Sequence, residues 1–227
     1  MLQQLVNILA LESLGDDRFR GRNMHPRGFR IYGGQVLAQA VSAAQQTVDP
    51  NRLIHSQHAY FLRPGDCAEP VIYEVERARD GGSFTSRRVV ALQKDRPILV
   101  CSLSFQTDDK GYDFQQDIPE VVAPETLPSE RQRAIDSNTL DEDFMITTGE
   151  DLDVRMVRPI DWENPKQAEG ELMNWMKTTA PVADDPALHA QLLTYMSDTM
   201  VLDAGLIQHG FSWIQSDLQL ASLDHAI

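Results

Sequence analysis

Residues 35–48, QVLAQAVSAAQQTV, constrain the possible folds of this chain more than any other segment of its sequence. Apolar residues recur there at helical spacing and share one side: Val36, Leu37, Ala40, Val41 and Ala44. Many of these side chains are small, which allows a helix to lie close to a sheet. We therefore expect a helix, opened by Gly33-Gly34, that packs tightly on a sheet surface.

Strand-like runs follow this helix in close succession, and residues typical of turns separate them. The runs cover residues 53–63, 71–79, 84–94 and 97–106. A helical pattern at 2–11 and an alternating stretch at 17–22 precede the long helix. This order predicts an α+β fold in which one long helix lies on one face of an antiparallel sheet.

The character of the sequence changes near residue 107 and again near residue 150. Residues 1–107 form the predicted N-terminal domain, and the Pro-rich, acidic stretch 108–150 is a predicted linker with one short helix. Residues 151–227 are expected to begin a second domain, with a strand at 151–157, a helix at 187–206 and a strand at 213–223. Because the chain ends inside a predicted strand, we expect further strands from beyond Ile227 or from a partner.

Charge and composition exclude several classes of function. The formal net charge is -14, which disfavours nucleic acid or an anionic membrane as the main partner. No apolar run of about 18 residues is present, and the N-terminal stretch lacks the basic region of a signal peptide. Two cysteines, Cys67 and Cys101, are too few for a disulfide framework and do not fit a structural zinc site. We expect a cytoplasmic protein.

A cluster of basic residues stands out against this acidic background. It lies within residues 18–30 and contains Arg18, Arg20, Arg22, Arg27 and Arg30. Such a patch could receive a phosphorylated small molecule, and a solvated basic strand edge explains it equally well.

The stretch from Phe19 to Asp66, FRGRNMHPRGFRIYGGQVLAQAVSAAQQTVDPNRLIHSQHAYFLRPGD, resembles the N-terminal signature of acyl-CoA thioesterases of the type II, double hot-dog family. The similarity continues through VIYEVERARDGGSFTSRRVVALQKDRPILVCSLSFQ and covers nearly all of residues 10–106. In the second half, MSDTMVLDAGLIQHG and LQLASLDHAI are similar to the second-domain helix and the following strand. The resemblance implies two hot-dog domains, each a long helix packed on an antiparallel sheet, with the second incomplete in this chain.

The resemblance also implies a reaction, the hydrolysis of fatty acyl-CoA thioesters to free fatty acid and coenzyme A, with no metal and no organic cofactor. The family uses an Asp, a Thr or Ser, and a Gln to hold and activate a water molecule. Asp198 in MSDTM matches the Asp, and Ser222 in LASLDH matches the hydroxyl residue. The Gln is expected beyond Ile227, and a homo-oligomer is expected because hot-dog sheets commonly pair edge to edge.

The sequence itself supports a special role for Asp198. On the predicted helix it falls beside an apolar stripe, with Tyr195, Val201 and Leu202 as neighbours one turn away. Burial would raise its pKa, which suits a base or a water-orienting group. A solvated aspartate at the edge of the stripe is the alternative. The hydroxyl of Ser222 can both donate and accept a hydrogen bond, although a serine on a strand often has no special role.

Gly33, Gly34 and Gln35 open the first long helix, whose N-terminal amides are natural donors to an oxyanion or a phosphate. They are candidate substrate-binding residues. Close packing of the helix on the sheet explains the two glycines equally well.

Other chemically active residues are not assigned a role. Asp224 and His225 are adjacent on a predicted strand and should point to opposite faces, and the same is expected of His55 and His58. Each histidine is interpreted as a hydrogen-bonded strand residue. No motif places an activating histidine beside a cysteine, no GxSxG motif is present, and no spacing supports a metal site.

Two further functions compete with hydrolysis. A non-catalytic acyl-CoA-binding protein would bind without turnover, and a hot-dog enoyl-CoA hydratase or dehydratase would need an acid–base pair converging on the α and β carbons of the substrate. No such pair is found in the sequence. A purely structural protein is disfavoured because polar residues interrupt the apolar stripe of the second helix.

Overall fold

The computed structural model describes the chain except residues 1, 25–29, 138–150, 169–170 and 214–217. It contains two compact units. The first comprises Met1–Lys110, Val182–Asp198 and Ser222–Ile227, and the second comprises Gly111–Pro181 and Thr199–Ala221. No helix among the described residues is long and apolar enough to cross a membrane.

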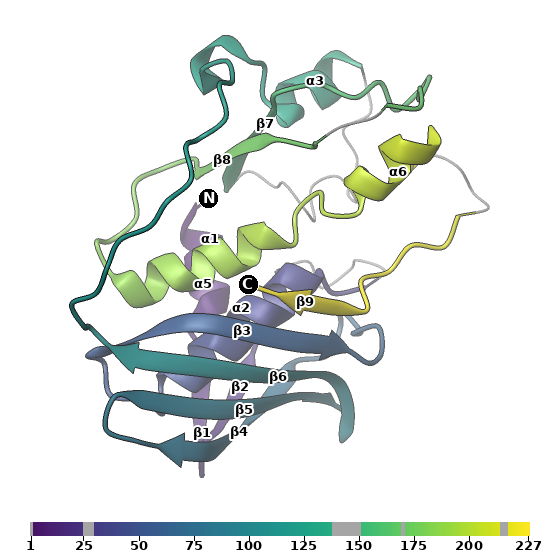
Figure 1. The fold of residues 1–227 in the computed structure, drawn as a ribbon. Coiled ribbons are helices and arrows are strands. Elements are labelled where there is room, and N and C mark those ends of the chain that lie inside the picture. The colour runs from purple at the N-terminus through teal and green to yellow at the C-terminus, as the bar shows by residue number, and fades with distance from the viewer. Residues whose placement is uncertain (1, 25–29, 138–150, 169–170, 214–217) are drawn as a thin grey trace. The chain divides into compact units, whose positions relative to one another are not determined.

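A seven-stranded antiparallel sheet, counted over the described residues, is the framework of the first unit (Figure 1). Its spatial order is β1-β2-β4-β5-β6-β3-β9. The bounds are β1 Glu12–Gly15, β2 Arg18–Gly21, β3 Arg52–Phe61, β4 Val71–Asp80, β5 Phe84–Gln93, β6 Arg96–Thr107 and β9 Asp224–Ala226. The strands predicted after the long helix are thereby confirmed to within two residues, because their alternating apolar residues form one buried face.

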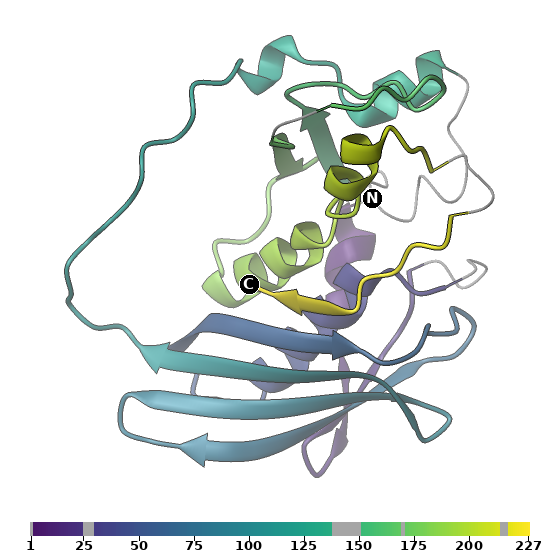
Figure 2. The same cartoon turned by 45° about the vertical axis from the view of Figure 1, so that its right-hand side comes forward.

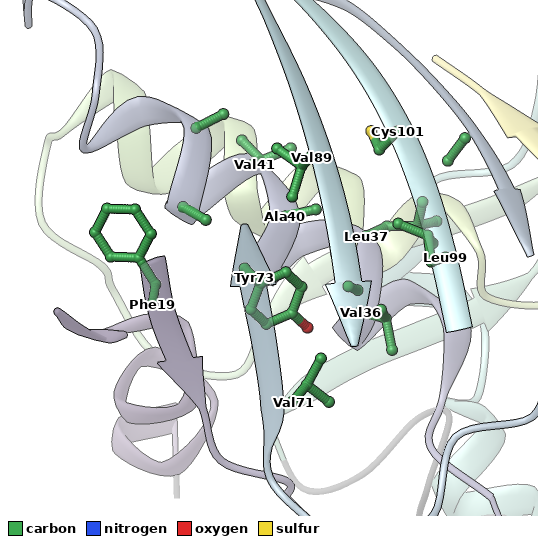
Figure 3. Packing of buried hydrophobic residues seen from close by; sticks show 14 of the residues in the cluster. Phe19, Val36, Leu37, Ala40, Val41, Val71, Tyr73, Val89, Leu99 and Cys101 are labelled. Carbon is green, nitrogen blue, oxygen red and sulfur yellow. The ribbon is translucent and has the colours of Figure 1, made fainter. Parts of the chain in front are cut away.

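The predicted long helix is α2, Gly33–Gln45, and it lies across one face of the sheet (Figure 1). Every residue from Gly34 to Ala44 is buried, since the helix is covered by more than the sheet alone. Figure 3 shows its side chains packed against those of β2, β4, β5 and β6. The labelled residues of this core are Phe19, Val36, Leu37, Ala40, Val41, Val71, Tyr73, Val89, Leu99 and Cys101.

Two further helices of the first unit contact α2. α1 (Leu2–Leu9) receives hydrogen bonds on its last carbonyl oxygens from the α2 side chains, since Gln39 donates to Ile8 at 2.7 Å and Ser42 donates to Leu9 at 2.6 Å. α5 (Pro186–Ser197) is joined to α2 by the Gln191 amide, which donates to Gln45 at 2.7 Å. These bonds satisfy the polar groups that α2 carries into the interior.

The buried guanidinium of Arg87, which is 2% exposed, links the end of α2 to the sheet. Its five N–H groups make five hydrogen bonds: two to Thr47, at 2.8 and 2.9 Å, and one each to Asp80 at 2.7 Å, Ser86 at 2.9 Å and Arg79 at 3.1 Å. The five hydrogen bonds offset the desolvation cost of this buried charge, whereas removal of the guanidinium leaves buried acceptors without partners.

Arg87→Met is therefore expected to lower the free energy of unfolding by about 3 kcal/mol, measured by urea denaturation. Arg88→Met is the matched control, because Arg88 is exposed and lies 3.6 Å from Glu76, a pair expected to contribute less than about 1 kcal/mol. Equal losses in the two variants would contradict a specific role for the Arg87 network.

At one edge of the sheet, β9 runs beside β3 (Figure 2). His225 lies opposite Ala59, and the pairing continues past the strand, where Gln57 and Ile227 exchange hydrogen bonds of 2.8 and 3.0 Å. The segment from Ser222 to Ile227 is thereby fixed on the first unit.

The second unit is smaller. It contains a hairpin of β7 (Leu152–Met156) and β8 (Asn174–Thr178), a 3-10 turn η1 (Pro124–Thr126), and the helices α3 (Glu130–Asp136) and α6 (Asp203–His209). The short helix expected in the predicted linker is confirmed as α3. The compact units differ from the predicted domains 1–107 and 151–227, because α5 and β9 pack with the first unit.

Three predictions about the second half and β3 need correction. The predicted helix 187–206 is broken, since α5 ends at Ser197 and α6 begins at Asp203. In the predicted strand 213–223, residues 214–217 lie outside the described chain and 218–223 form no strand, while β9 begins at Asp224. A bulge between Ile54 and Ser56 shifts the register of β3. His55 and His58 are consequently both exposed instead of facing opposite ways.

Candidate active site

Asp198 is the residue around which the predicted site forms. It caps the C-terminal end of α5, and its side chain is only 8% exposed. The predicted burial is confirmed, although its cause differs from the expected apolar stripe: Val201 is 50% exposed. The carboxylate is instead buried against the start of α2 and the segment that leads into β9.

The two oxygens of the Asp198 carboxylate have different surroundings. The backbone N–H of Gly34 and the hydroxyl of Ser222 both form hydrogen bonds with this side chain. Oδ1 has no hydrogen-bond partner among the described residues, so Oδ2 accepts both. The two residues predicted to act together, Asp198 and Ser222, are therefore in direct contact, although Ser222 lies before β9 and not within a strand.

Burial raises the pKa of Asp198 to about 6, against the lowering effects of the Gly34 amide, the Ser222 hydroxyl and the charge of Arg30. Its position at the C-terminal end of α5 is also unfavourable for a negative charge, whereas the N-terminal end of α2 is favourable. The carboxylate is ionised at pH 7 to 8 and is a stronger base than an ordinary aspartate.

His225 approaches Asp198 from β9. Its side chain is 9% exposed, and Nδ1 lies 3.7 Å from Asp198 Oδ1, while Nε2 lies 2.9 Å from the hydroxyl of Ser197. Burial lowers the pKa of His225, and neighbouring Asp224 partly offsets this effect. Asp224 itself is exposed and lies 3.5 Å from His58, so the prediction that Asp224 and His225 face opposite ways is confirmed.

Comparison with known proteins identifies the family. A family model described as "Acyl-CoA thioesterase N-terminal domain" matches residues 21–106, and one described as "Acyl-CoA thioesterase" matches residues 156–227. Acyl-CoA thioesterase 2 of Haemophilus influenzae is 34% identical over 100% of this chain and 80% of its own length. The chain belongs to the acyl-CoA thioesterase II family.

Solved structures agree with this assignment. The crystal structure of an acyl-CoA thioesterase II from Mycobacterium marinum is 36% identical, with a TM-score of 0.75 over 98% of this chain and 76% of its own. A protein from Alicyclobacillus acidocaldarius described as having a hot-dog fold is 16% identical, with a TM-score of 0.71 over 98% of this chain and 76% of its own, which supports the fold alone. The predicted hot-dog architecture of the acyl-CoA thioesterase II family is thus confirmed.

The three residues predicted to bind substrate have distinct environments in this acyl-CoA thioesterase II chain. A side chain on Gly33 would place its first carbon 2.6 Å from Asp198 Oδ2, and one on Gly34 would meet the carbonyl oxygen of Tyr195. The side chain of Gln35 is buried and bonded to the preceding segment, since it accepts from the Met24 amide at 3.1 Å and donates to Asn23 at 3.0 Å. Their contact with substrate remains a prediction.

The cluster of arginines at 18–30 is partly paired. Arg18 lies 3.1 Å from Glu74 and Arg20 lies 3.1 Å from Glu12, whereas Arg27 lies outside the described residues. Arg30 is exposed, and its charge acts on the carboxylate of Asp198. The solvated-edge interpretation thus accounts for the two arginines on β2.

The cysteines carry no catalytic features. Both are buried thiols without a disulfide, and burial raises the pKa of Cys101 to about 12 and that of Cys67 above its usual value. Within the described part of the chain, no group of three or more His, Cys, Asp or Glu side chains could hold a metal ion.

Sequence reasoning missed two features of the site, the proximity of His225 to Asp198 and the contribution of Gly34 as a donor to the carboxylate. The pattern around Asp224-His225 indicated only that the two side chains point to opposite faces of a strand. Which of them faces Asp198 depends on how β9 pairs with β3, and no local sequence signal specifies this pairing.

Proposed function

We propose that this chain hydrolyses fatty acyl-CoA thioesters to a free fatty acid and coenzyme A through a water molecule activated by Asp198. The observation that carries the proposal is a buried carboxylate with a raised pKa, held on one oxygen by the Gly34 amide and the Ser222 hydroxyl. The names of the similar proteins support the same reaction, since the Haemophilus influenzae relative is an acyl-CoA thioesterase.

The proposed mechanism needs no cofactor. The oxygen of the water forms a bond to the thioester carbonyl carbon while its proton passes to Asp198. The carbon–sulfur bond then breaks, and the proton returns from Asp198 to the departing sulfur, which leaves as the thiol of coenzyme A. The Ser222 hydroxyl donates its hydrogen to Asp198. The lone pairs of its oxygen can therefore accept a hydrogen bond from the water and orient it.

A role for Gly33, Gly34 and Gln35 in substrate binding is part of the proposal. Gly33 is the best supported of the three, because a side chain at this position would collide with Asp198 Oδ2. The Gly34 amide donates a hydrogen bond to the Asp198 carboxylate. The Gln35 side chain forms hydrogen bonds with Met24 and Asn23, which precede α2.

The first test is the release of free thiol from palmitoyl-CoA. It compares this chain with a fusion that continues past Ile227 with the corresponding segment of the Haemophilus influenzae relative, because the resemblance expects the catalytic Gln there. Turnover by either form that depends on Asp198 supports the proposal. Binding of acyl-CoA by both forms without thiol release would favour a binding protein, and hydration of enoyl-CoA would favour a hydratase.

Cytoplasmic location and homo-oligomeric assembly complete the proposal. Two buried thiols without a disulfide fit a reducing compartment. The assembly is tested by light scattering after size-exclusion chromatography, where a mass equal to one chain would contradict it.

A further inference from the structure

The fold brings an aromatic side chain, that of Phe61, to the carboxylate of Asp198. Phe61 is the last residue of β3 and shares the inner face of this strand with Ala59, which is fully buried. Its own side chain is half-buried and packs against the core under α2. The backbone N–H of Phe61 donates to the carbonyl oxygen of Leu223 at 2.9 Å, so this residue joins β3 to the segment that carries Ser222.

The surroundings of Gly33 show how near the Phe61 ring is to the carboxylate. A first side-chain carbon on Gly33 would lie 2.6 Å from Asp198 Oδ2 and 3.0 Å from Cζ of Phe61, with Cε1 of the same ring at 3.1 Å. The gap between Oδ2 and the ring is therefore no greater than the first two of these distances together. Even a methyl group would overlap both groups, so the ring and Gly33 leave no room for water on this side of Oδ2.

The two oxygens of Asp198 differ in their access to water. Oδ1 is fully buried, whereas the side chain as a whole is 8% exposed. Oδ2, which accepts the hydrogen bonds of the Gly34 amide and the Ser222 hydroxyl, is therefore the oxygen that a water molecule can reach. The Phe61 ring closes one side of that approach.

We propose that Phe61 is a positioning residue for the base, whose ring covers one side of Asp198 Oδ2, keeps bulk water off it, and makes this oxygen a better proton acceptor than that of an exposed aspartate. The inference rests on the proposed hydrolysis, in which Oδ2 takes a proton of the attacking water. In that step an O–H bond of water breaks, an O–H bond on Oδ2 forms, and the electron pair of the water oxygen forms the bond to the thioester carbon. Phe61 takes no part in the bond changes and acts only on the surroundings of Oδ2.

A phenyl ring acts on a neighbouring carboxylate in two opposite ways. Its edge is weakly positive and favours the ionised form, whereas its bulk removes water and favours the protonated form. Burial is the largest influence on Asp198 and raises its pKa to about 6, although the Gly34 amide, the Ser222 hydroxyl and the charge of Arg30 all lower it. The loss of water thus outweighs the opposing effects at this site, and we expect the same balance for the ring.

The charged and titratable neighbours of Asp198 in the described chain lie before α2 and on β9. Arg30, before α2, is a cation whose charge acts on the carboxylate. His225, on β9, approaches the other oxygen, with Nδ1 3.7 Å from Oδ1, and burial lowers the pKa of this histidine. Phe61 itself is uncharged, so its replacement by another uncharged residue changes the access of water and not the charge around Asp198.

The test is the titration of the Asp198 carboxyl carbon by NMR. The protein is labelled with carbon-13 at aspartate, and the signal of Asp198 is identified by its absence in Asp198→Asn. Phe61→Ala is expected to lower the midpoint of this titration by about one pH unit, because water then reaches Oδ2 from the side of β3. Phe61→Leu keeps part of the apolar cover and should lower the midpoint by a smaller amount, and it replaces Phe61→Ala if the alanine variant does not fold.

Tyr60→Ala is the matched control. Tyr60 precedes Phe61 on β3, points to the opposite face of the sheet and is 53% exposed, so its loss should leave the titration of Asp198 unchanged. An unchanged or raised midpoint in the Phe61 variants would overturn the inference, and so would an equal decrease in Tyr60→Ala.

Kinetics connect the cover to catalysis and separate this inference from the proposed function. In whichever form of the chain shows turnover, Phe61→Ala should lower kcat about three- to tenfold and move the acid limb of its pH profile to lower pH. A wild-type acid limb in Phe61→Ala would overturn the role of Phe61 in the reaction. If thiol release is absent, or if Asp198→Asn keeps full activity, the proposed function is wrong, while the NMR titration still decides whether the ring controls the proton affinity of Asp198.

Discussion

Asp198→Asn is expected to lower kcat for acyl-CoA hydrolysis by about 10²–10⁴-fold while the fold is retained. The amide has nearly the shape of the carboxylate and can still accept the hydrogen bonds from Gly34 and Ser222. It cannot take a proton from water. Release of free thiol under saturating substrate measures the loss, in whichever form of the chain shows turnover.

The same variant is expected to be more stable than the wild type above pH 6. The pKa of Asp198 is raised from 3.8 to about 6, so between these pH values the native state holds a proton that the unfolded state has already lost. The stabilising contribution of that proton is complete below pH 3.8 and is lost as the pH rises through about 6. The neutral amide of the variant has no such pH dependence. At pH 8 the gain should be about 3 kcal/mol in urea denaturation, because the pKa of Asp198 rises from 3.8 to about 6 and each tenfold change in proton affinity is worth about 1.4 kcal/mol.

Asp203→Asn is the control for burial alone. Asp203 is 3% exposed, and burial raises its pKa to about 7, with Glu130 adding to the effect and a hydrogen bond from Trp213 opposing it. It belongs to the second unit and does not share the Gly34 and Ser222 donors. If Asp203→Asn lost as much activity as Asp198→Asn, the special role of Asp198 would be contradicted.

Gly34→Ala and Gly33→Ala are expected to fail in different ways. The added carbon at Gly34 would meet the backbone carbonyl oxygen of Tyr195 and come within 2.5 Å of the Tyr32 ring. Backbone cannot move without displacing α5 from α2, so we expect a loss of about 3 kcal/mol or more in the free energy of unfolding. Thermal unfolding should show a clear decrease in the midpoint.

At Gly33 the added carbon would meet side chains instead. Asp198 Oδ2 would lie 2.6 Å away and the Phe61 ring 3.0 Å away. Both can rotate, so the fold should survive with a loss of about 1 kcal/mol, while kcat falls at least tenfold because the carboxylate is displaced. A Gly33→Ala protein with normal kcat would show that the position of Oδ2 does not matter for catalysis. A stable Gly34→Ala protein would show that α2 and α5 are not in close contact.

The elements with strong local patterns could be predicted from the sequence. The spacing of small apolar residues along α2 indicates a helix, and the alternation of apolar residues along β3 to β6 indicates strands. Both signals depend only on residues close together in the sequence. The break after Ser197 could not be predicted in this way. No glycine or proline lies between Ala187 and Ala204, and Met200 takes a left-handed conformation (φ 63°) without the help of glycine.

The site was predicted in part because a resemblance selected Asp198 and Ser222, and the fold brings these two together. Their environment depends on contacts between distant segments. The hydrogen bonds to Asp198 come from Gly34 and Ser222, and the histidine beside it comes from the pairing of β9 with β3. Hydrophobic periodicity contains no information about such pairings.

The attachment of β9 at the edge of the sheet has a consequence for how the site can be lost. Ser222 and His225 lie in one short segment held to β3 by a three-residue strand and a few flanking hydrogen bonds. Such an edge opens by local fluctuation at a much smaller free-energy cost than global unfolding. Each opening would remove both partners from Asp198 together, while the core under α2 stays intact. The backbone amides of His225 and Ile227, which face β3, should exchange hydrogen with solvent long before those of β5, and their protection would indicate how often the site is assembled.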